Sequence, residues 1–376
     1  MTATGRRDVD GVEPDPLADT PAAPRRSLMA RLDAIEGLPI LLVFVIVLVV
    51  FMVLAPGTFL GHRIYKSLLI TAPPLLIVGL GLTLVIAAGE IDLSFPSVIA
   101  LSGFVFAACY RFDNVPYLAF LADGLEGEAL QAMKFRMAWL GMVLAVAVGG
   151  LIGYVNGLLI ARIGIPSIIA TLATQFLWRG VAVVVAAGLS YSLRGVKDSA
   201  VWQVTSGRLF DWFPMQAVWS LLIAVALWFV LNRHRFGEAL LFIGDNQQVA
   251  RVMGIDVAKE KIRLFTLMGL LGGVSGVFLT AENITFYTNQ GQGFLLLVIA
   301  AVFIGGTSIF GGSGTIVGTV FGTLIVLVVQ SGIVAAGVQG FWNDVVIGLI
   351  FIAAVVFHLV VERPERFKGL VFAPRG

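Results

Sequence analysis

Residues 81–94 read GLTLVIAAGEIDLS, an apolar run that ends in two acidic residues. A second apolar run follows at about 93–110, and two such runs in close succession are typical of membrane-crossing helices. Glu90 and Asp92 therefore stand at the junction of two hydrophobic segments, and Ser94 is suited to begin the second helix. If the chain is interrupted at membrane depth, these polar groups must face protein or water. The other interpretation is a short loop at the membrane face with solvated carboxylates.

The composition of the whole chain favours the same environment. Of 376 residues, 58% are hydrophobic and 13% are charged, whereas a soluble domain has about 25% charged residues. A soluble fold would leave much of this apolar surface in water, so the composition excludes a nucleic-acid binder, a disulfide scaffold and an ordinary soluble enzyme. Cys109 is a single cysteine, and the three histidines lie far apart in the sequence. No metal site and no cofactor are expected.

Ten apolar runs predict an all-α, polytopic membrane helix bundle with about ten transmembrane helices. Several runs are just long enough to cross a hydrocarbon core of roughly 30 Å at about 1.5 Å per residue. The second and third runs are only a few residues apart, as are the eighth and ninth. Each of these pairs is either a tight hairpin or a helix broken within the membrane. The runs are 38–55, 67–89, 93–110, 138–161, 165–188, 216–231, 264–281, 294–310, 314–335 and 341–361.

The segments outside these runs predict the domain organisation and the topology. Residues 1–37 are rich in Asp, Pro, Ala and Arg and are expected to form a disordered cytoplasmic tail. The membrane domain is expected at 38–361, followed by a short tail at 362–376. With ten crossings and the N-terminus inside, sixteen lysines and arginines face the cytoplasm and eight lie outside. This asymmetry predicts that both termini are cytoplasmic.

A hydrophilic segment near 232–263 predicts a short amphipathic helix. Asp245 and Asn246 are good N-cap residues, and Gly254 suits the left-handed position that ends a helix. The apolar residues between them fall on one face: Val249, Val252 and Met253. A helix of barely two turns is not stable alone in water, so it must pack against something. It is either an ordinary cytoplasmic connector or a docking helix for a soluble partner.

Glycines mark a second interruption and several close helix contacts. Residues 305–315 read GGTSIFGGSGT, which breaks a helix. The segment has no Walker lysine and follows no soluble strand, so it predicts a tight turn and no nucleotide site. Small residues recur at four-residue spacing and predict a tightly packed bundle. These residues are Gly149, Gly153, Gly157, Gly272, Gly276, Gly318 and Gly322.

Polar residues also occur within or near the predicted spans. We expect the threonines to make structural hydrogen bonds, and Arg179 to face the protein interior or reach a membrane surface. Asp92 and Asn156 are expected to form hydrogen bonds inside the bundle, with Arg179 as a candidate partner for Asp92. The polar residues of the spans are Asn156, Thr171, Thr174, Gln175 and Arg179.

Four stretches, in this order and spacing, resemble the permease subunits of bacterial ABC importers for monosaccharides, the ribose/xylose/inositol type. They are GLTLVIAAGEIDLS (81–94), YVNGLLIARIGIPSIIATLATQFLWRG (154–180), GDNQQVARVMGID (244–256) and AAVFIGGTSIFGGSGTIVGTVFG (300–322). The resemblance covers about residues 38 to 361. There are two departures. Many family members have a glycine where Glu90 stands, and many carry acidic residues where this chain has Leu295–Leu297.

The resemblance implies a sugar permease of the bacterial inner membrane, with no catalytic role and two pseudo-related halves. It implies a separate ATPase subunit, a periplasmic sugar-binding protein, a second permease copy and surrounding lipid as partners. The residues expected to contact the ATPase are Gly244, Asp245, Asn246, Val249, Ala250, Val252, Met253 and Gly254. The residues expected to line or support the pathway are Glu90, Asp92, Ser94, Asn156, Thr171, Thr174 and Arg179.

An ion-coupled secondary transporter of a small polar solute is the alternative. Such proteins keep acidic residues deep in the bundle, and Glu90 and Asp92 are the candidates here. A membrane enzyme is not indicated, because the chain has no HExxH and no GxSxG motif.

Overall fold

The computed structural model describes residues 37–362, so the tails expected at 1–37 and 362–376 lie outside the described residues except for Gly37 and Glu362. The first half of this range contains α2 (Leu38–Leu54), α3 (Pro56–Phe59), α4 (His62–Ala87), α5 (Phe95–Tyr110), η1 (Ala119–Ala122), α6 (Gly127–Leu158), η2 (Leu159–Ile163), α7 (Ser167–Val185), β1 (Tyr191–Ser192), η3 (Val196–Asp198) and α8 (Ala200–Ser206). The second half contains β2 (Arg208–Leu209), β3 (Phe213–Pro214), α9 (Met215–Arg233), α10 (Arg235–Asp245), α11 (Gln247–Val252), α12 (Val257–Asn283), β4 (Thr285–Phe286), α13 (Phe294–Ile304), α14 (Ile316–Ala335), η4 (Gly340–Trp342) and α15 (Asn343–Glu362).

The prediction of an all-helical fold is confirmed, and each of the ten apolar runs corresponds to a helix. Within residues 37–362, six helices are long and apolar enough to cross a membrane: His62–Ala87, Gly127–Ile163, Ser167–Val185, Met215–Arg233, Val257–Asn283 and Ile316–Ala335. The other apolar helices are shorter: Leu38–Leu54, Phe95–Tyr110, Phe294–Ile304 and Gly340–Val356. The strands are two-residue pairs, β1 with β4 and β2 with β3, both antiparallel.

Several helix bounds differ from the apolar runs. Helix α6 begins at Gly127, eleven residues before the expected run, because its polar first turns continue the helix beyond the apolar stretch. Helix α13 ends at Ile304 rather than at residue 310, because the glycines at 305 and 306 follow. Helix α12 begins at Val257, where Asp256 accepts a hydrogen bond from the backbone of Lys259. Helix ends depend on such caps, which a hydropathy pattern does not report.

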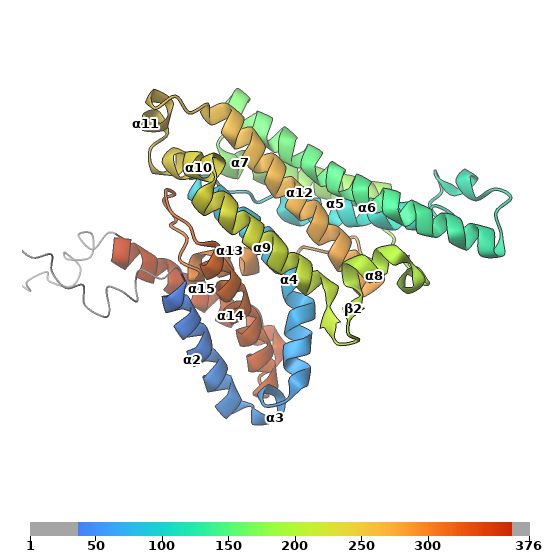
Figure 1. The fold of residues 1–376 in the computed structure, drawn as a ribbon, viewed down its shortest axis with the longest axis horizontal. Helices are drawn as coiled ribbons and strands as arrows, with labels where there is room; N and C mark the ends of the chain where they lie inside the picture. Colours follow the sequence, from blue (N-terminus) through green and yellow to red (C-terminus); the bar gives the residue numbers. More distant parts are fainter. Residues whose placement is uncertain (1–36, 363–376) are drawn as a thin grey trace, which may run out of the picture. The chain divides into compact units, whose positions relative to one another are not determined.

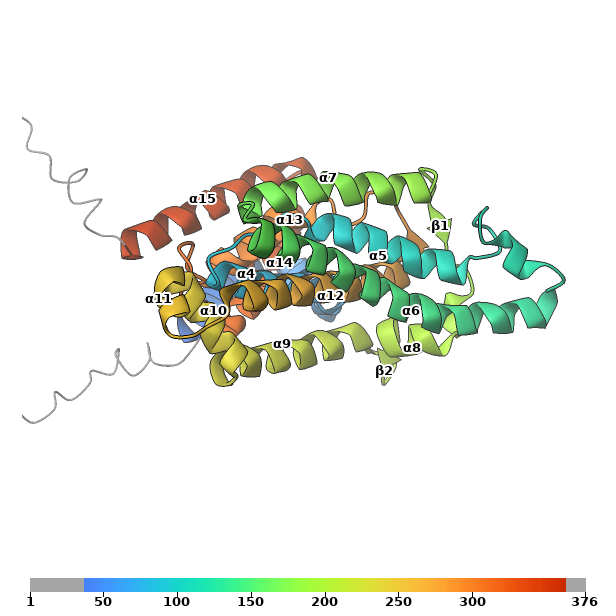
Figure 2. The ribbon, with the colours of Figure 1, turned by 90° about the horizontal axis from the view of Figure 1, so that it is seen from above.

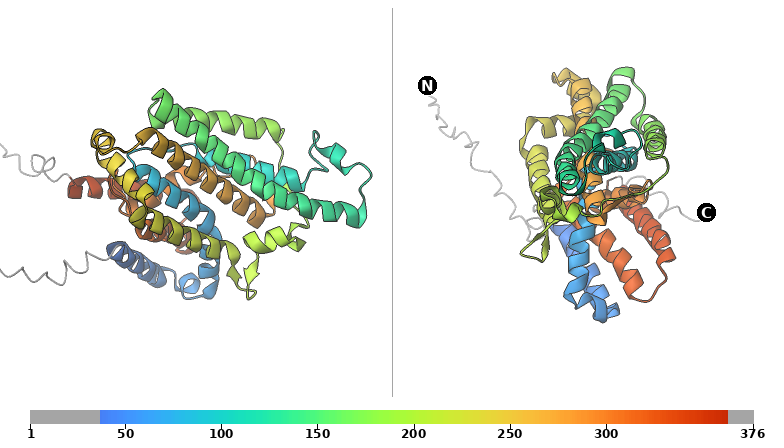
Figure 3. Two further views of the ribbon diagram at one scale, coloured as in Figure 1. Left: turned by 45° about the horizontal axis from the view of Figure 1, so that its top comes forward. Right: turned by 90° about the vertical axis from the view of Figure 1, so that its right-hand side faces the viewer.

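Helix α4 is the central element of the bundle. Every residue from 72 to 87 is buried, which is the pattern of a helix surrounded by protein on all sides. It contacts four other helices of the bundle, α9, α12, α13 and α14. Two groups of helices lie apart from each other in Figure 3. One contains α2 (blue), α14 and α15 (orange to red), and the other contains α5, α6 and α12. Ser275 of α12 donates a hydrogen bond to the carbonyl oxygen of Pro74 at 2.7 Å, so a neighbouring helix also satisfies the backbone of α4.

The seam between α6 and α12 depends on glycine. A Cβ atom added to Gly149 would lie 2.4 Å from the carbonyl oxygen of Gly269, and one added to Gly153 would lie 2.1 Å from that of Phe265. At Gly157 the nearest atom, Cα of Ile262, would be 2.7 Å away. The four-residue spacing noted in the sequence therefore marks one continuous contact between two helix backbones.

The two closely spaced helix pairs have different geometries. Helices α13 and α14 form a tight hairpin, in which a Cβ atom on Gly318 would lie 1.9 Å from the carbonyl oxygen of Gly305. Helix α4 packs mainly against α12, and α5 packs against α6 and α12, instead of against each other. Their connection at residues 88–94 is therefore a crossing segment of the bundle, whereas residues 305–315 close a hairpin.

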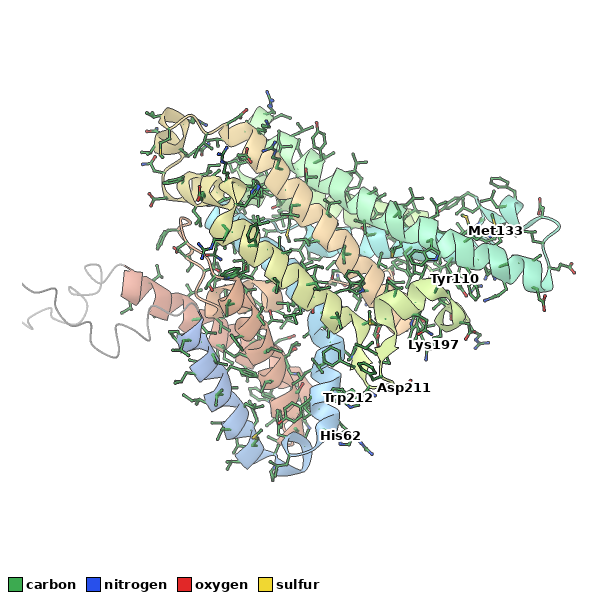
Figure 4. The ribbon with its side chains drawn as sticks, viewed as in Figure 1. His62, Tyr110, Met133, Lys197, Asp211 and Trp212 are labelled. Atoms are coloured by element: carbon green, nitrogen blue, oxygen red, sulfur yellow. The ribbon has the colours of Figure 1, made fainter. Side chains whose placement is uncertain are left out.

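The two ends of the bundle carry different elements. Helices α10 and α11 lie at the same end as the start of α2 and the end of α15 (Figures 1 and 2). The opposite end holds the residues labelled Tyr110, Lys197, Asp211 and Trp212 in Figure 4. At that end, Glu282 forms an ion pair with Arg208 (2.6 Å).

We expect Gly153→Ala to lower the melting temperature of the purified protein in detergent. The added methyl group would force α6 away from α12, and overpacking of a close interface costs typically about 1–3 kcal/mol. Gly180→Ala is the matched control, because a Cβ atom there meets nothing within 4 Å. Equal melting temperatures for the two variants would contradict the close approach at this seam.

Candidate functional site

The segment between α4 and α5 is extended and is held by one face of α7. Three polar side chains of α7, spaced four residues apart, accept hydrogen bonds from its backbone N–H groups or from the first turn of α5. Such spacing places the three side chains on one side of the helix. The bonds run from Ile91 to Ser167 Oγ (3.1 Å), from Leu93 to Thr171 Oγ1 (3.0 Å) and from Ser97 to Gln175 Oε1 (3.0 Å).

These contacts place the segment well inside the bundle. Gln175 lies eight residues beyond Ser167, which corresponds to about 12 Å along α7. Backbone that leaves helical geometry at such depth must be satisfied by protein. The side chains of α7 supply this, and Thr171 also donates to the carbonyl oxygen of Ser167 (2.7 Å). Thr174 differs, because its hydroxyl donates only to the carbonyl oxygen of Thr171 within its own helix (3.2 Å).

Asp92, Ser94 and Asn156 form a buried hydrogen-bonded chain. Oδ1 of Asp92 accepts from the backbone N–H of Ser94 (2.7 Å) and from its hydroxyl (2.6 Å). Oγ of Ser94 in turn accepts from Nδ2 of Asn156 on α6 (2.8 Å). All three residues are almost completely buried. The chain joins the start of α5 to α6, so it fixes where α5 begins.

Arg179 lies outside this cluster. Its Nη2 atom is 3.4 Å from Oε1 of Gln292, in the segment before α13, and its side chain is partly exposed. The pairing with Asp92 that the sequence suggested is not found among residues 37–362. Arg179 lies twelve residues into α7, whereas the Asp92 segment contacts the first three turns of that helix.

Glu90 forms an ion pair with Lys261 of α12. The Glu90 side chain is 12% exposed and that of Lys261 is 9% exposed, so neither charge is fully solvated. Lys261 Nζ also lies 3.3 Å from Oε1 of Gln247, the first residue of α11. A cavity of about 600 Å³ adjoins the pair, and Arg251 is part of its lining. The interpretation of a loop with freely solvated carboxylates is therefore wrong for Glu90.

Three segments meet at Gly244, near the end of α10. A Cβ atom on Gly244 would lie 1.9 Å from the carbonyl oxygen of Ala87 and 2.6 Å from the backbone nitrogen of Gly312. That nitrogen donates to the same Ala87 oxygen (2.8 Å). The end of α4, the α13–α14 turn and α10 thus touch at one point. The sequence showed two glycine-containing breaks but gave no sign that they meet.

The hydrophilic segment contains two helices, α10 and α11, where one was predicted. Asn246 alone is the N-cap of α11 and accepts from the backbone of Gln248 (3.0 Å) and Val249 (3.2 Å). Asp245, proposed as a cap, is the last residue of α10. Gly254 has φ +86°, the left-handed conformation expected at the end of the helix.

Helix α11 has an anchored side and an open side. Ala250 is completely buried and packs with Ile243 of α10 and Val257 of α12. The predicted apolar face points away from this contact. Its exposed fractions are 50% for Val249, 89% for Val252 and 57% for Met253. The helix is therefore held by the bundle and presents uncovered apolar side chains at its end.

Comparison with known proteins identifies the chain. A family model described as "Branched-chain amino acid transport system / permease component" matches residues 64–355. The chain belongs to this family. It is 31% identical to the ribose import permease protein RbsC of Escherichia coli (strain K12), over 84% of this chain and 91% of the relative.

Two further relatives are also permease proteins of sugar transport systems. The chain is 29% identical to the D-allose transport system permease protein AlsC of Escherichia coli (strain K12), over 85% of this chain and 91% of that protein. It is 30% identical to the L-arabinose transport system permease protein AraH of the same organism, over 77% and 80%. No solved structure matches the chain.

The protein is thus a multi-pass permease component of a bacterial ABC importer, and the family resemblance noted in the sequence is confirmed. As a transport component it has no catalytic role and carries no cofactor; an ATPase and a binding protein are its implied partners. Within the described residues, no group of three or more His, Cys, Asp or Glu side chains could hold a metal ion.

We expect Thr171→Val to destabilise the permease, because the N–H of Leu93 loses its acceptor. A buried polar group without a partner costs about 1–3 kcal/mol. Thr174→Val is the matched control on the same helix, since Thr174 bonds only within α7. Thermal unfolding and the yield of monodisperse protein measure the difference. If the two variants were equally stable, α7 would not hold the segment as described.

Proposed function

We propose that this permease imports a monosaccharide across the inner membrane, driven by ATP hydrolysis in a separate subunit. The observation that carries the proposal is the alignment, over 77–85% of this chain, with permeases named for ribose, D-allose and L-arabinose. The family description names branched-chain amino acids, but these three relatives are named for sugars. Ion coupling is disfavoured because Asp92 is engaged by Ser94 and Glu90 by Lys261.

The proposed topology has ten crossings with both termini in the cytoplasm. The start of α2, the end of α15 and helices α10 and α11 share one end of the bundle, which supports an even number of crossings. The excess of lysine and arginine at that end supports a cytoplasmic location. The shorter helices α2, α5, α13 and α15 complete the ten crossings in this arrangement.

Helices α10 and α11 form the proposed docking site for the ATPase. Exposed apolar side chains next to charged residues suit a protein partner better than water. Movement of these helices would reach the rest of the bundle through Gly244, which lies against both breaks. The residues proposed to contact or support the ATPase are Gly244, Asp245, Asn246, Val249, Ala250, Val252, Met253 and Gly254.

The polar residues around the α4–α5 segment are proposed to support the pathway and not to bind sugar directly. Asp92, Ser94 and Asn156 fix the start of α5, and Thr171 holds the segment against α7. Thr174 and Arg179 form their hydrogen bonds elsewhere and are assigned no sugar contact. We place the pathway between two copies of the permease, with lipid around the remaining exposed apolar faces. We also propose that the break at Glu90–Ser94 and the break at Gly305–Gly314 occupy related places in two halves of the fold.

Uptake by proteoliposomes tests this function. Together with its ATPase and its binding protein, the permease should accumulate at least one radiolabelled sugar among D-ribose, D-allose and L-arabinose when ATP is present. Uptake should stop when the ATPase subunit is omitted and should persist when a proton or sodium gradient is dissipated. Uptake that follows the ion gradient and ignores ATP would contradict the proposal.

The docking site is tested in the same system with Val252→Asp. A charge at a position 89% exposed should leave folding intact but weaken ATPase binding by several-fold and reduce uptake in proportion. Phe210→Asp is the control, because Phe210 is also 89% exposed and lies in the turn between β2 and β3. Pull-down of the ATPase should distinguish the two variants, and equal binding would argue against docking at α11.

A further inference from the structure

The ion pair between Glu90 and Lys261 joins the two parts of the protein that coupling must connect. Glu90 belongs to the α4–α5 segment, and Lys261 lies in the second turn of α12. Lys261 Nζ also contacts Oε1 of Gln247 at 3.3 Å, and Gln247 begins α11. We propose that Glu90 and Lys261 act as a positioning pair that transmits movement of α11 to the α4–α5 segment. The proposal rests on the proposed function, because it requires an ATPase that moves α11.

The surroundings of the pair favour a functional role over a surface ion pair. Exposed ion pairs contribute little because water and salt screen them. Here both side chains are mostly covered, at 12% and 9% exposed, so each charge depends on the other. Removing one partner would leave a poorly solvated charge at the junction between α11, α12 and the break.

Helices α10 and α11 contact the neighbouring segments in different ways, α10 through backbone atoms and α11 through side chains. At Gly244, backbone packs directly on backbone, and a rigid contact of this type holds α10 in place. Helix α11 reaches the break through side chains, Gln247 through Lys261 to Glu90, beside a cavity of about 600 Å³. Side chains next to open space can shift without a steric clash. This arrangement lets the side chains between α11 and the break adjust when α11 moves, while the Glu90–Lys261 pair keeps the break attached to α12.

Other charged groups near the pair have separate roles or face the same cavity. Asp256 caps α12 through the backbone N–H of Lys259 (3.0 Å). Arg263 pairs with Glu260 within α12 (2.9 Å). Arg251 lines the cavity from α11. The pair between Glu90 and Lys261 is the ion pair that links α12 to the α4–α5 segment in the described part of the chain.

The test measures sugar transported per ATP hydrolysed by the full importer in proteoliposomes. The probe is the sugar taken up among D-ribose, D-allose and L-arabinose. Glu90→Gln and Lys261→Met should each lower this ratio roughly tenfold, within the range of free energies that couple linked sites. Exchanging the charges, Glu90→Lys with Lys261→Glu, should restore much of the ratio. ATPase binding should stay unchanged in all of these variants.

A variant with both charges removed separates positioning from stability. Glu90→Gln with Lys261→Met leaves no unpaired buried charge, so the protein should fold with normal yield. We still expect the low ratio, because the connection is gone. Arg263→Met is the control, since it removes an ion pair two residues away on the same helix whose arginine side chain is 54% exposed, and it should keep the wild-type ratio.

The outcomes distinguish the inference from the function on which it rests. If wild-type importer shows no ATP-driven sugar uptake, the proposed function is wrong and the inference fails with it. If wild type transports sugar and the doubly neutral variant keeps the wild-type ratio, only the positioning role is wrong. A loss in Arg263→Met as large as that in Lys261→Met would also overturn it, because any charge lost from α12 would then have the same effect.

Discussion

Backbone N–H and C=O groups inside a membrane protein must find partners within the protein, and the α4–α5 segment shows how this chain meets that requirement. Ser167, Thr171 and Gln175 of α7 accept hydrogen bonds from backbone N–H groups that helix geometry would otherwise have satisfied. Because the segment is held in this way, α5 can begin inside the bundle and α4 can end beside α10. The position of the acidic residues, the start of α5 and the contact with α10 all depend on this hydrogen-bonded face of α7.

The same segment brings distant parts of the chain together. The end of α4, where the segment starts, meets the α13–α14 turn through the hydrogen bond from Gly312 to Ala87 and meets α10 at Gly244. Glycine permits this approach, because any side chain at Gly244 would overlap the Ala87 carbonyl. The proposed docking surface at one end of the bundle is therefore in direct physical contact with both interruptions. This geometry fits a permease in which ATP is hydrolysed by another subunit and the mechanical effect enters through α10 and α11.

The sequence predicted the helices well and the contacts between them poorly. Long apolar runs give each helix because burial and length are local properties, and the spacing of Gly149, Gly153 and Gly157 correctly indicated a close helix contact. The cap at Asn246 and the turn at Gly254 were also readable from local chemistry. Pairings between side chains of different helices could not be predicted in this way. Arg179 contacts Gln292 and not Asp92, and Glu90 pairs with Lys261, 171 residues further along the chain. Such pairings depend on how helices cross, which residue spacing alone does not determine.

Hydrogen–deuterium exchange of the permease in lipid nanodiscs tests most directly whether α7 satisfies the interrupted backbone. The peptide covering residues 88–97 has no continuous helix, yet its amides at Ile91, Leu93 and Ser97 are bonded to α7. We expect these amides to exchange as slowly as those of α4. Exchange as fast as that of the connecting segment at 113–126 would show that the break is open to water, and would contradict the account given for the α4–α5 segment.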